Sequence, residues 1–489
     1  MQVTKQRVFS DFNKLKILAR KYLEKKKYEE VMEILKIAAR LMYNFNLIYT
    51  DDEMENMIVN ISKELFKSEI NLKMDNDNNI VIFYDYFSLD NRGLTEQYLE
   101  ALINLDYKII YITQQNNKVK MKSILKLLSN SSKAEYYIIN SKLNKIEKTI
   151  KIREIILEKN PRYIFNHTAP WDIIGMTALV GIPAEKYLIN LTDHAFWLGK
   201  ACTDYYIEFR SYGKNVSKYY RKISSDKEFI LPYYPITNKE IEFSGFPFEI
   251  TNKKLIFSGG SLYKIYGSSE FFELVKYILK IDKDTIFLYL GNGNDKILRK
   301  FISDNNLEKR FYFFNERRDI NEIFKRCYFY LGTYPLCGGL MTQLAVVNKR
   351  VPICYCGKGE NINDVSELFI NNSEKFIFNN LEEMKLEIKK LLFDSKYKEN
   401  KEEKLENKII SKKEFTEELK NILIKKKTTI YKEKNYIPDT NKVIAMYFEQ
   451  ENRYLKNYGN IFLTRNLKLN LYFFKYNFLA ILKYLKRKL

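Results

Sequence analysis

Two series of alternating strand-like and helix-like segments most constrain how this chain can fold. The first series runs from NIVIFYDYF at 79–87 through LTEQYLEALINLD at 94–106 to YKIIYIT at 107–113. Further strands are predicted at EYYIIN, RYIFNH, EKYLINL and DYYIEFR. Buried strands that alternate with helices build a parallel sheet with crossover helices. The sequence therefore predicts an α/β domain over residues 76–248.

The second series follows SGFPFEITN at 244–252, where Gly245 and Pro247 interrupt both patterns. Its predicted strands are KKLIFSGG, TIFLYLG, RFYFF, YFYLG and VPICY, and its predicted helices are SSEFFELVKYILKI, INEIFKRC and GGLMTQLAVVN. The same argument predicts a second doubly wound domain over residues 249–400.

Helical segments flank these two domains. In residues 1–75 apolar side chains recur every three or four positions, and the stretch ARKYLEKKKYEEVMEILKIAARLMYNF resembles one tetratricopeptide helix pair. We expect this region either to cap the next domain or to bind a partner. Residues 401–489 are predicted to form basic helices.

The last of these helices carries a basic stripe, formed by Lys468, Lys475, Lys483 and Lys486. Aromatic and aliphatic residues cover most of the rest of its surface. Such a helix can lie on an anionic membrane surface, or its apolar face can pack onto the protein. Both alternatives remain open from the sequence.

The charge and length limit the function classes. The chain has 489 residues and a formal net charge of +21. An anionic partner is expected, which can be a nucleic acid, an anionic membrane or a phosphorylated small molecule. The charged N-terminus and the lack of a long apolar run predict a cytoplasmic protein.

Neither the cysteines nor the acidic residues suggest a metal centre. The five cysteines, Cys202, Cys327, Cys337, Cys354 and Cys356, lack zinc-site spacing, and the chain has only two histidines. Cys354 and Cys356 alternate along a predicted strand, so we expect buried free thiols there. Asp282 and Asp284 lie in a polar turn between a helix and a strand. No metal site is predicted.

Glycines follow several predicted strands of the second domain. They are Gly259 and Gly260 with the neighbouring Ser258, then Gly291 and Gly293, and finally Gly338 and Gly339 at the start of a helix. In open α/β sheets ligands bind beyond the carboxyl ends of the strands. Backbone amides at glycines and at a helix start favour a phosphate group. Glycine at a helix start can also serve packing alone.

Basic and hydroxyl side chains lie beside these glycines in the sequence. Lys264 follows Gly260, Arg317 and Arg318 follow another strand, and Thr342 lies in the first turn after Gly339. Lysine offers a compact positive charge, and arginine can bind two oxygens at once. Together these residues predict a binding site for a nucleotide diphosphate.

The stretches SGGSLYKI, TIFLYLG and FYFFNERRDINEIFKRCYFYLGTYPLCGGLMTQLAVVNKRVPICYCGKGE resemble the donor half of GT-B glycosyltransferases. They are most similar to the O-linked N-acetylglucosamine transferases and the adhesin N-glycosyltransferases. The resemblance implies that Lys264 contacts the diphosphate and that Gly338, Gly339 and Thr342 cradle it. It also implies two facing Rossmann-like domains, with the N-terminal helical cap and C-terminal helices added.

The chain departs from that family at two positions. Leu340 and Ala345 stand where the acetylglucosamine transferases have a histidine and an acidic residue that binds ribose. The long repeat solenoid of those enzymes is also missing. The resemblance therefore predicts the diphosphate site but not the sugar or the nucleoside.

The general base is sought in the first domain, at the ends of its strands. Candidates are Asp90, His167 and His194, the last with Asp193 as its neighbour. Histidine has a suitable intrinsic pKa for this role. Arg92 and Gly93 are predicted to bind an anion on the acceptor side, and Trp171 or Trp197 to flank a sugar ring.

The sequence thus predicts a metal-independent transferase without a cofactor, and the family resemblance implies that it inverts the sugar carbon. It would move a sugar from a nucleotide-diphosphate donor, with UDP expected, to a glycan or lipid-linked acceptor in cell-surface polysaccharide synthesis. Alternatives are a protein glycosyltransferase, a nucleotide-sugar epimerase and a CDP-glycerol glycerophosphotransferase. A nucleic-acid-binding protein and a membrane scaffold are the non-enzyme alternatives, although no nucleic-acid-binding module is recognised. The inner face of the plasma membrane is a possible location.

Overall fold

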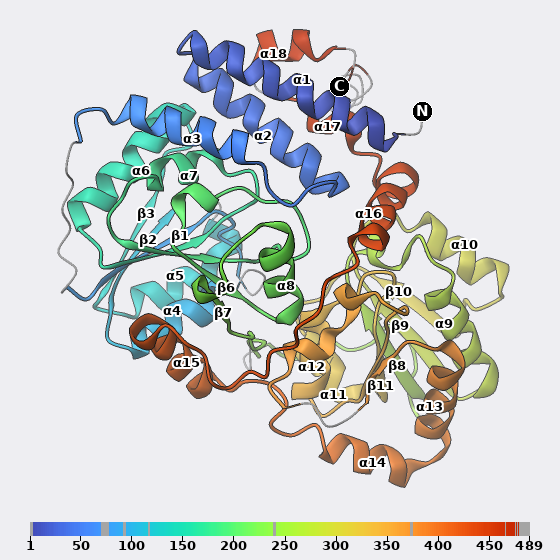
Figure 1. Cartoon of the computed structure of the whole chain (residues 1–489). Helices are drawn as coiled ribbons and strands as arrows, with labels where there is room; N and C mark the ends of the chain where they lie inside the picture. Colours follow the sequence, from blue (N-terminus) through green and yellow to red (C-terminus); the bar gives the residue numbers. More distant parts are fainter. Residues whose placement is uncertain are drawn as a thin grey trace. The chain divides into compact units, whose positions relative to one another are not determined.

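The computed structural model describes residues 3–69, 78–90, 94–115, 118–237, 241–371, 375–464, 466–474, 476 and 478. The chain divides into two compact units (Figure 1). The first unit comprises Met1–Leu231, Phe415–Ile437 and Leu455–Leu489, and the second comprises Pro232–Glu414 and Pro438–Tyr454.

The first unit is built on a parallel sheet of seven strands in the order β3-β2-β1-β4-β5-β6-β7. The strands are β1 (Ile80–Asp85), β2 (Lys108–Thr113), β3 (Ala134–Ile138), β4 (Tyr163–His167), β5 (Glu185–Ile189), β6 (Tyr205–Glu208) and β7 (Glu228–Ile230). The connecting helices are α4 (Thr95–Asn104), α5 (Lys122–Ser129), α6 (Lys145–Lys159), α7 (Ile173–Leu179) and α8 (Ser211–Tyr220). The strands predicted from the sequence are confirmed, and β7 is an additional strand.

Three helices precede this sheet: α1 (Lys5–Glu24), α2 (Tyr28–Phe45) and α3 (Asp52–Leu65). They lie against α6 and α7 in Figure 1. Two carboxylates of these helices accept hydrogen bonds from backbone amides in the rest of the first unit. Glu55 accepts hydrogen bonds from the amides of Gly199, Lys200 and Ala201 at 2.8–3.1 Å. Glu29 accepts hydrogen bonds from the backbone amides of Lys145 and Ile146 at the start of α6. These contacts make the helices a cap on the first unit.

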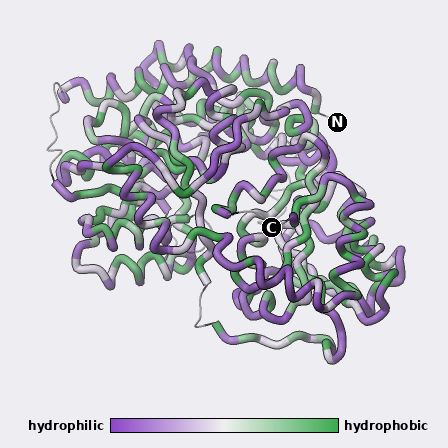
Figure 2. Tube along the Cα trace, turned by 60° about the horizontal axis from the view of Figure 1, so that its bottom comes forward, coloured by the Kyte–Doolittle hydropathy of each residue, from purple (hydrophilic) through white to green (hydrophobic). Residues whose placement is uncertain are grey.

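The second unit has a parallel sheet of six strands in the order β10-β9-β8-β11-β12-β13. The strands are β8 (Lys254–Gly259), β9 (Thr285–Leu290), β10 (Phe311–Phe314), β11 (Phe329–Leu331), β12 (Pro352–Tyr355) and β13 (Ile377–Phe378). The helices are α9 (Glu270–Ile281), α10 (Lys296–Asp304), α11 (Ile320–Arg326), α12 (Gly339–Val347), α13 (Leu381–Phe393) and α14 (Ser395–Glu403). Helices α9 and α13 cover one apolar face, and α11 and α12 cover the other. Along several outer helices hydrophilic and hydrophobic residues alternate (Figure 2), as expected for helices that pack on one side.

The join between the units differs from the predicted one at residue 248. The second unit begins at Pro232, because the segment that follows packs onto its own sheet. Phe248 stacks on Tyr312 with ring centroids 4.0 Å apart, and Phe243 and Phe246 contact the same core. The apolar side chains of this join therefore prevent it from acting as a free linker.

The C-terminal region, predicted as one block over residues 401–489, is divided between the units. Helix α15 (Lys412–Lys425) lies mostly in the first unit, and α16 (Thr440–Glu449) lies in the second. Helices α17 (Tyr458–Ile461) and α18 (Leu467–Tyr472) return to the first unit.

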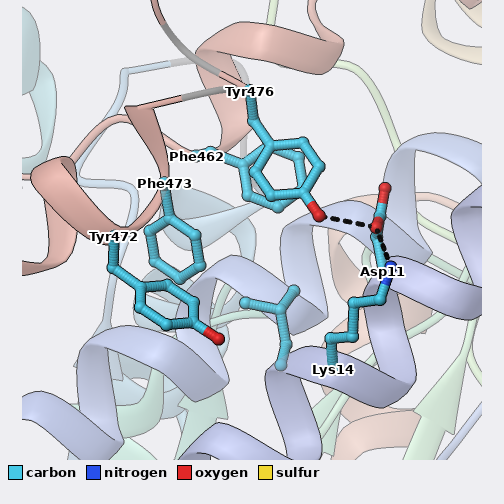
Figure 3. A pocket seen from close by; sticks show the side chains of 7 residues that line it. Asp11, Lys14, Phe462, Tyr472, Phe473 and Tyr476 are labelled. Carbon is cyan, nitrogen blue, oxygen red and sulfur yellow. Dashed lines mark hydrogen bonds and ion pairs between the residues drawn. The ribbon is translucent and has the colours of Figure 1, made fainter.

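The returning segment packs on α1 around a cavity of about 240 Å³ (Figure 3). Tyr458 and Tyr476 donate hydrogen bonds to the buried Asp11 carboxylate. Leu469 and Phe473 are buried, whereas Leu471 and Phe474 are exposed. Part of the apolar surface thus packs onto the protein. Of the basic stripe, Lys468 is exposed, and Lys475, Lys483 and Lys486 lie outside the described residues.

No helix within the described ranges is long and apolar enough to cross a membrane.

Candidate functional site

The backbones of the loops after β8 and β9 are in direct contact. The Gly260 amide donates to the Leu290 carbonyl at 2.9 Å, and the Tyr289 hydroxyl donates to the Gly260 carbonyl at 3.0 Å. A Cβ atom at Gly291 would lie 1.9 Å from the Gly260 oxygen. Gly260 and Gly293 have φ angles of +139° and +134°, which disfavour other residues. The glycines after these two strands are thus required by the local backbone.

Side chains of Asn363, Thr333 and Thr342 form hydrogen bonds with backbone groups of the loop after β11. Asn363 accepts from the Cys337 amide at 3.0 Å and donates to the Pro335 carbonyl at 2.9 Å. The Thr333 hydroxyl donates to the Leu336 carbonyl at 2.6 Å, and Thr342 donates to the Gly338 carbonyl from both its amide and its hydroxyl. These hydrogen bonds stabilise this conformation of the loop.

This loop ends at the N-terminus of α12, where backbone donors remain free. Within the described part of the chain, the amides of Gly339 and Leu340 have no hydrogen-bond acceptor. The first amides of a helix carry a partial positive charge, which attracts anions. The end of α12 can therefore bind an anion through its backbone.

Lys264 lies in a short 3₁₀ helix, Leu262–Ile265, which contacts the same loop. Its carbonyl accepts a hydrogen bond from the Leu336 amide at 3.2 Å. Burial lowers the pKa of its ammonium, and the neighbouring Cys337 thiol opposes that shift. No carboxylate pairs with Lys264 among the residues that the structure describes. The structure thus places Lys264 beside the loop that leads to Gly338 and Gly339.

Three other predicted donor-binding side chains already have structural partners or are enclosed. Arg317 is committed to Asp319 and to the Gly245 carbonyl. The Thr342 hydroxyl bonds within its own loop, and the Ser258 side chain is fully buried. Arg318 is exposed and forms no ion pair with the described residues. Direct phosphate contacts from Arg317, Thr342 and Ser258 therefore do not fit this structure.

A cavity of about 490 Å³ adjoins the other end of this loop. Tyr334, Pro335 and Glu360 line it on one side, and residues of α16 line it on the other. Lys264 and the glycine pair do not line it. The described residues contain no cluster of three side chains able to hold a metal ion.

In the first unit, His194 and Asp193 are in contact as predicted. His194 Nδ1 lies 2.9 Å from Asp193 Oδ1, and Arg210 Nε donates to Asp193 Oδ2 at 2.7 Å. Burial alone would raise the pKa of Asp193, but Arg210 and His194 outweigh it and lower that pKa below its usual range. The His194 side chain is 30% exposed. Asp193 thus orients an imidazole that solvent can reach.

The other candidates for a base are held by structural contacts. His167 is fully buried, with Nδ1 3.1 Å from Asp85 Oδ1. The Asp90 carboxylate accepts hydrogen bonds from the amides of Ser123 and Ile124, at the start of α5. His167 as an acceptor-side residue is wrong, because no surface of its side chain is accessible. Asp90 acts as a helix cap.

Among the other predicted acceptor-side residues of the first unit, Trp197 needs correction. Trp197 is 2% exposed and packs with Leu188, Tyr206 and Ile223, so it belongs to the core and cannot flank a sugar. The prediction for Arg92 and Gly93 lies outside the described residues.

Sequence reasoning missed two residues that shape the donor loop. Asn363 fixes its backbone, and Cys337 lies beside Lys264. The stretch GENINDV around Asn363 carries no recognisable motif. Cys337 belongs to the PLCGG stretch that resembles the glycosyltransferase donor loop. Its position directly before the two glycines was the one available indication that it lies in the site.

Sequence reasoning also missed a group of buried charges in the first unit. Glu228 is 3% exposed, and neither carboxylate oxygen has a hydrogen-bond partner among the described residues. Burial raises its pKa to about 9, and the nearby Glu208 adds to the shift. Burial likewise raises the pKa of Glu208 to about 7.

We expect Glu228→Gln to stabilise the protein at alkaline pH. A carboxyl group whose pKa rises on folding contributes full stability below its unfolded pKa, and this is lost as pH rises towards the folded pKa. The loss runs from about pH 4.5 to about pH 9. At pH 9 the variant should be more stable by about 2 kcal/mol or more, and near pH 5 it should match the wild type.

Denaturant midpoints at pH 5, 7 and 9 measure this difference. Glu154→Gln is the matched control, because the Glu154 side chain is 58% exposed. If the denaturant midpoints of wild type and Glu228→Gln change with pH in the same way, the buried carboxyl does not titrate in this range.

Comparisons with known proteins show similarity in structure only. No known protein family and no curated protein sequence matches the chain. The O-GlcNAc transferase of Thermobaculum terrenum is 12% identical with a TM-score of 0.53, over 91% of this chain and 82% of that one. A Listeria monocytogenes protein assigned as a UDP-N-acetylglucosamine 2-epimerase is 12% identical with a TM-score of 0.51, over 73% and 100%. HepE of Anabaena, solved with UDP and glucose, is 11% identical with a TM-score of 0.50, over 70% and 98%.

Proposed function

We propose that this chain, which has the GT-B fold of glycosyltransferases, transfers a sugar from a nucleotide-diphosphate donor. One observation carries the proposal. The partly buried ammonium of Lys264 pairs with no carboxylate among the described residues. It lies beside a loop that leads into helix amides for which the same part of the chain offers no acceptor. This combination is suited to a diphosphate. UDP is the first nucleotide to test, because HepE was solved with it.

The chemistry follows from the charge that develops during transfer. When the bond between sugar and diphosphate breaks, negative charge grows on the leaving phosphate. Lys264 would neutralise it, and the amides of Gly339 and Leu340 would donate hydrogen bonds to its oxygens. These groups are held in place before the reaction, so they need little reorganisation. The proposed mechanism does not require a metal ion to stabilise the leaving group.

We assign the general base to His194. Inversion at the sugar carbon requires a base that takes the proton of the acceptor hydroxyl. Asp193 holds the imidazole through Nδ1, and the His194 side chain is 30% exposed, so an acceptor hydroxyl can reach it. His167 is enclosed and Asp90 caps a helix, so His194 is the most suitable candidate.

The acceptor is proposed to be a glycan or a lipid-linked glycan of cell-surface polysaccharide synthesis. The exposed apolar side chains of the C-terminal segment and the basic residues that follow would bring the enzyme to an anionic membrane. Protein glycosylation and glycerophosphate transfer from a CDP-linked donor remain alternatives for the same donor site.

Ligand-induced stabilisation tests the donor. UDP, GDP, CDP and dTDP are each added to the purified protein, and the melting temperature is measured. A ligand that binds only the native state raises it. We expect UDP to raise it most, and Lys264→Ala to lose this shift while the control Lys283→Ala, at an exposed turn, keeps it. Equal shifts in both variants would contradict the proposed site.

An epimerase is the second candidate, favoured by the similarity to the Listeria protein. Nucleotide release from UDP-sugars distinguishes the two activities. Release that requires an added glycan acceptor and disappears in His194→Gln supports transfer. Conversion of the donor sugar without any acceptor supports epimerisation.

A further inference from the structure

Two cysteine side chains meet behind the donor loop. Cys354 lies on β12 and is fully buried, whereas Cys337 lies in the loop after β11 and is partly exposed. Each thiol has the largest influence on the pKa of the other, as expected for neighbouring side chains. The Thr342 hydroxyl oxygen lies 3.7 Å from Cys354 Sγ. Residues from the loop, from β12 and from α12 thus gather around one pair of sulfur atoms.

Local backbone geometry holds Cys354 towards the loop. Gly332 lies beside it, directly after the adjacent strand β11, and a Cβ atom at this glycine would be 2.6 Å from Cys354 Sγ. Only glycine leaves room for the sulfur here. The Cys337 backbone is fixed from the other side, because its amide donates to Asn363 at 3.0 Å. Both cysteines are therefore held in place in the reduced protein.

The surroundings favour a thiolate on Cys337. The hydrogen bond from Cys354 lowers the pKa of Cys337 most, and Lys264, Thr342 and the Gly338 amide lower it further, against the effect of burial. The pKa of Cys354 is raised, because it shares its proton with the Cys337 sulfur. By contrast, burial raises the pKa of Cys327 to about 12. Oxidants attack thiolates, so Cys337 should react first among these three cysteines.

We propose that Cys337 and Cys354 are an oxidisable dithiol pair that closes to a disulfide on exposure to a peroxide. The Cys337 thiolate attacks hydrogen peroxide, which breaks the O–O bond and leaves a sulfenic acid and one water once the hydroxide is protonated. The Cys354 thiol then attacks the sulfenic sulfur, and a second water departs with its proton. The two sulfurs lose two electrons, and the peroxide gains them.

The disulfide would change the donor loop. An S–S bond is about 2.05 Å long, which is shorter than any non-bonded contact between two sulfur atoms. Closing the bond therefore pulls Cys337 towards β12 and moves the adjoining Gly338 and Gly339. It also removes the thiolate beside Lys264. Displacements of about 1 Å in a binding site can change rates roughly a hundredfold. This consequence rests on the proposed function, whereas the disulfide itself does not.

Mass spectrometry tests the disulfide directly. The full-length reduced protein is treated with hydrogen peroxide, free thiols are alkylated, and the digest is searched for the peptide pair joined through Cys337 and Cys354. We expect this crosslink in wild type and in the control Cys327→Ser, and its loss in Cys337→Ser and Cys354→Ser. Its absence in wild type, with the two cysteines alkylated or each oxidised separately, would overturn the proposal.

Binding of UDP to the same samples tests the coupling to the loop. Oxidation should weaken UDP binding about tenfold in wild type, dithiothreitol should restore it, and Cys354→Ser should be insensitive. A crosslinked protein that binds UDP as tightly as the reduced one would overturn the coupling. Failure of the reduced wild type to bind UDP would contradict the proposed function, whereas the crosslink result would still decide the dithiol pair.

Discussion

Lys264→Ala should lower sugar transfer at least a hundredfold while the protein stays folded. Removing one group that stabilises charge in a transition state typically costs a factor of about 10² to 10³. The lysine is partly buried and pairs with no carboxylate among the described residues, so its removal leaves no buried carboxylate unpaired. The melting temperature should therefore be unchanged or slightly higher.

Turnover of the donor with acceptor, together with the melting temperature, measures both effects. Lys283→Ala is the control, since Lys283 is exposed in a turn of the same unit. Lys264→Arg keeps the charge but changes its shape, and we expect it to recover part of the activity. Transfer by Lys264→Ala within a few-fold of wild type would remove this lysine from the mechanism.

Gly291→Ala should cause the largest loss of stability among the substitutions considered. The added Cβ would lie 1.9 Å from the Gly260 carbonyl oxygen and 2.9 Å from its carbon, both backbone atoms. Backbone cannot move aside as a flexible side chain does. Overpacking of this kind typically costs about 1–3 kcal/mol and sometimes more, and we expect about 3 kcal/mol or more here.

Denaturant midpoints compare Gly291→Ala with Gly338→Ala. At Gly338 the nearest atoms would lie 3.7 Å from the new Cβ, and its φ angle of −91° suits any residue. The control should keep the wild-type midpoint, whereas Gly291→Ala should lower it clearly. Equal midpoints would mean that the loops after β8 and β9 can separate at little cost.

The elements and the donor loops could be predicted because local patterns determine them. Apolar runs of β1, β8 and β9 alternate with amphipathic helices, and glycines follow strands wherever two backbones approach closely. The same rule placed Lys264 near Gly338 and Gly339, since parallel strands end at one edge of a sheet.

Side-chain direction could not be predicted in this way. The strand-end rule selected His167 and Trp197, but it does not say whether a side chain turns towards solvent or into the core. His167 hydrogen-bonds with Asp85 on the neighbouring strand, and that pairing depends on the order of the strands. Cys337 and Cys354 likewise meet only because β11 and β12 are adjacent. The buried Glu228 gave no signal, because a glutamate in a short strand usually faces solvent.

The division of the C-terminal region between the units has a consequence for biosynthesis. A ribosome releases the chain from its N-terminus, so the first sheet and its helical cap emerge long before residues 415–437 and 455–478. Until then, the Asp11 carboxylate lacks the tyrosines that it later binds, Tyr458 and Tyr476. The first unit therefore cannot form all of its contacts during translation until the second unit has been synthesised. A gene fragment that stops at residue 231 would encode a first unit without its C-terminal segments.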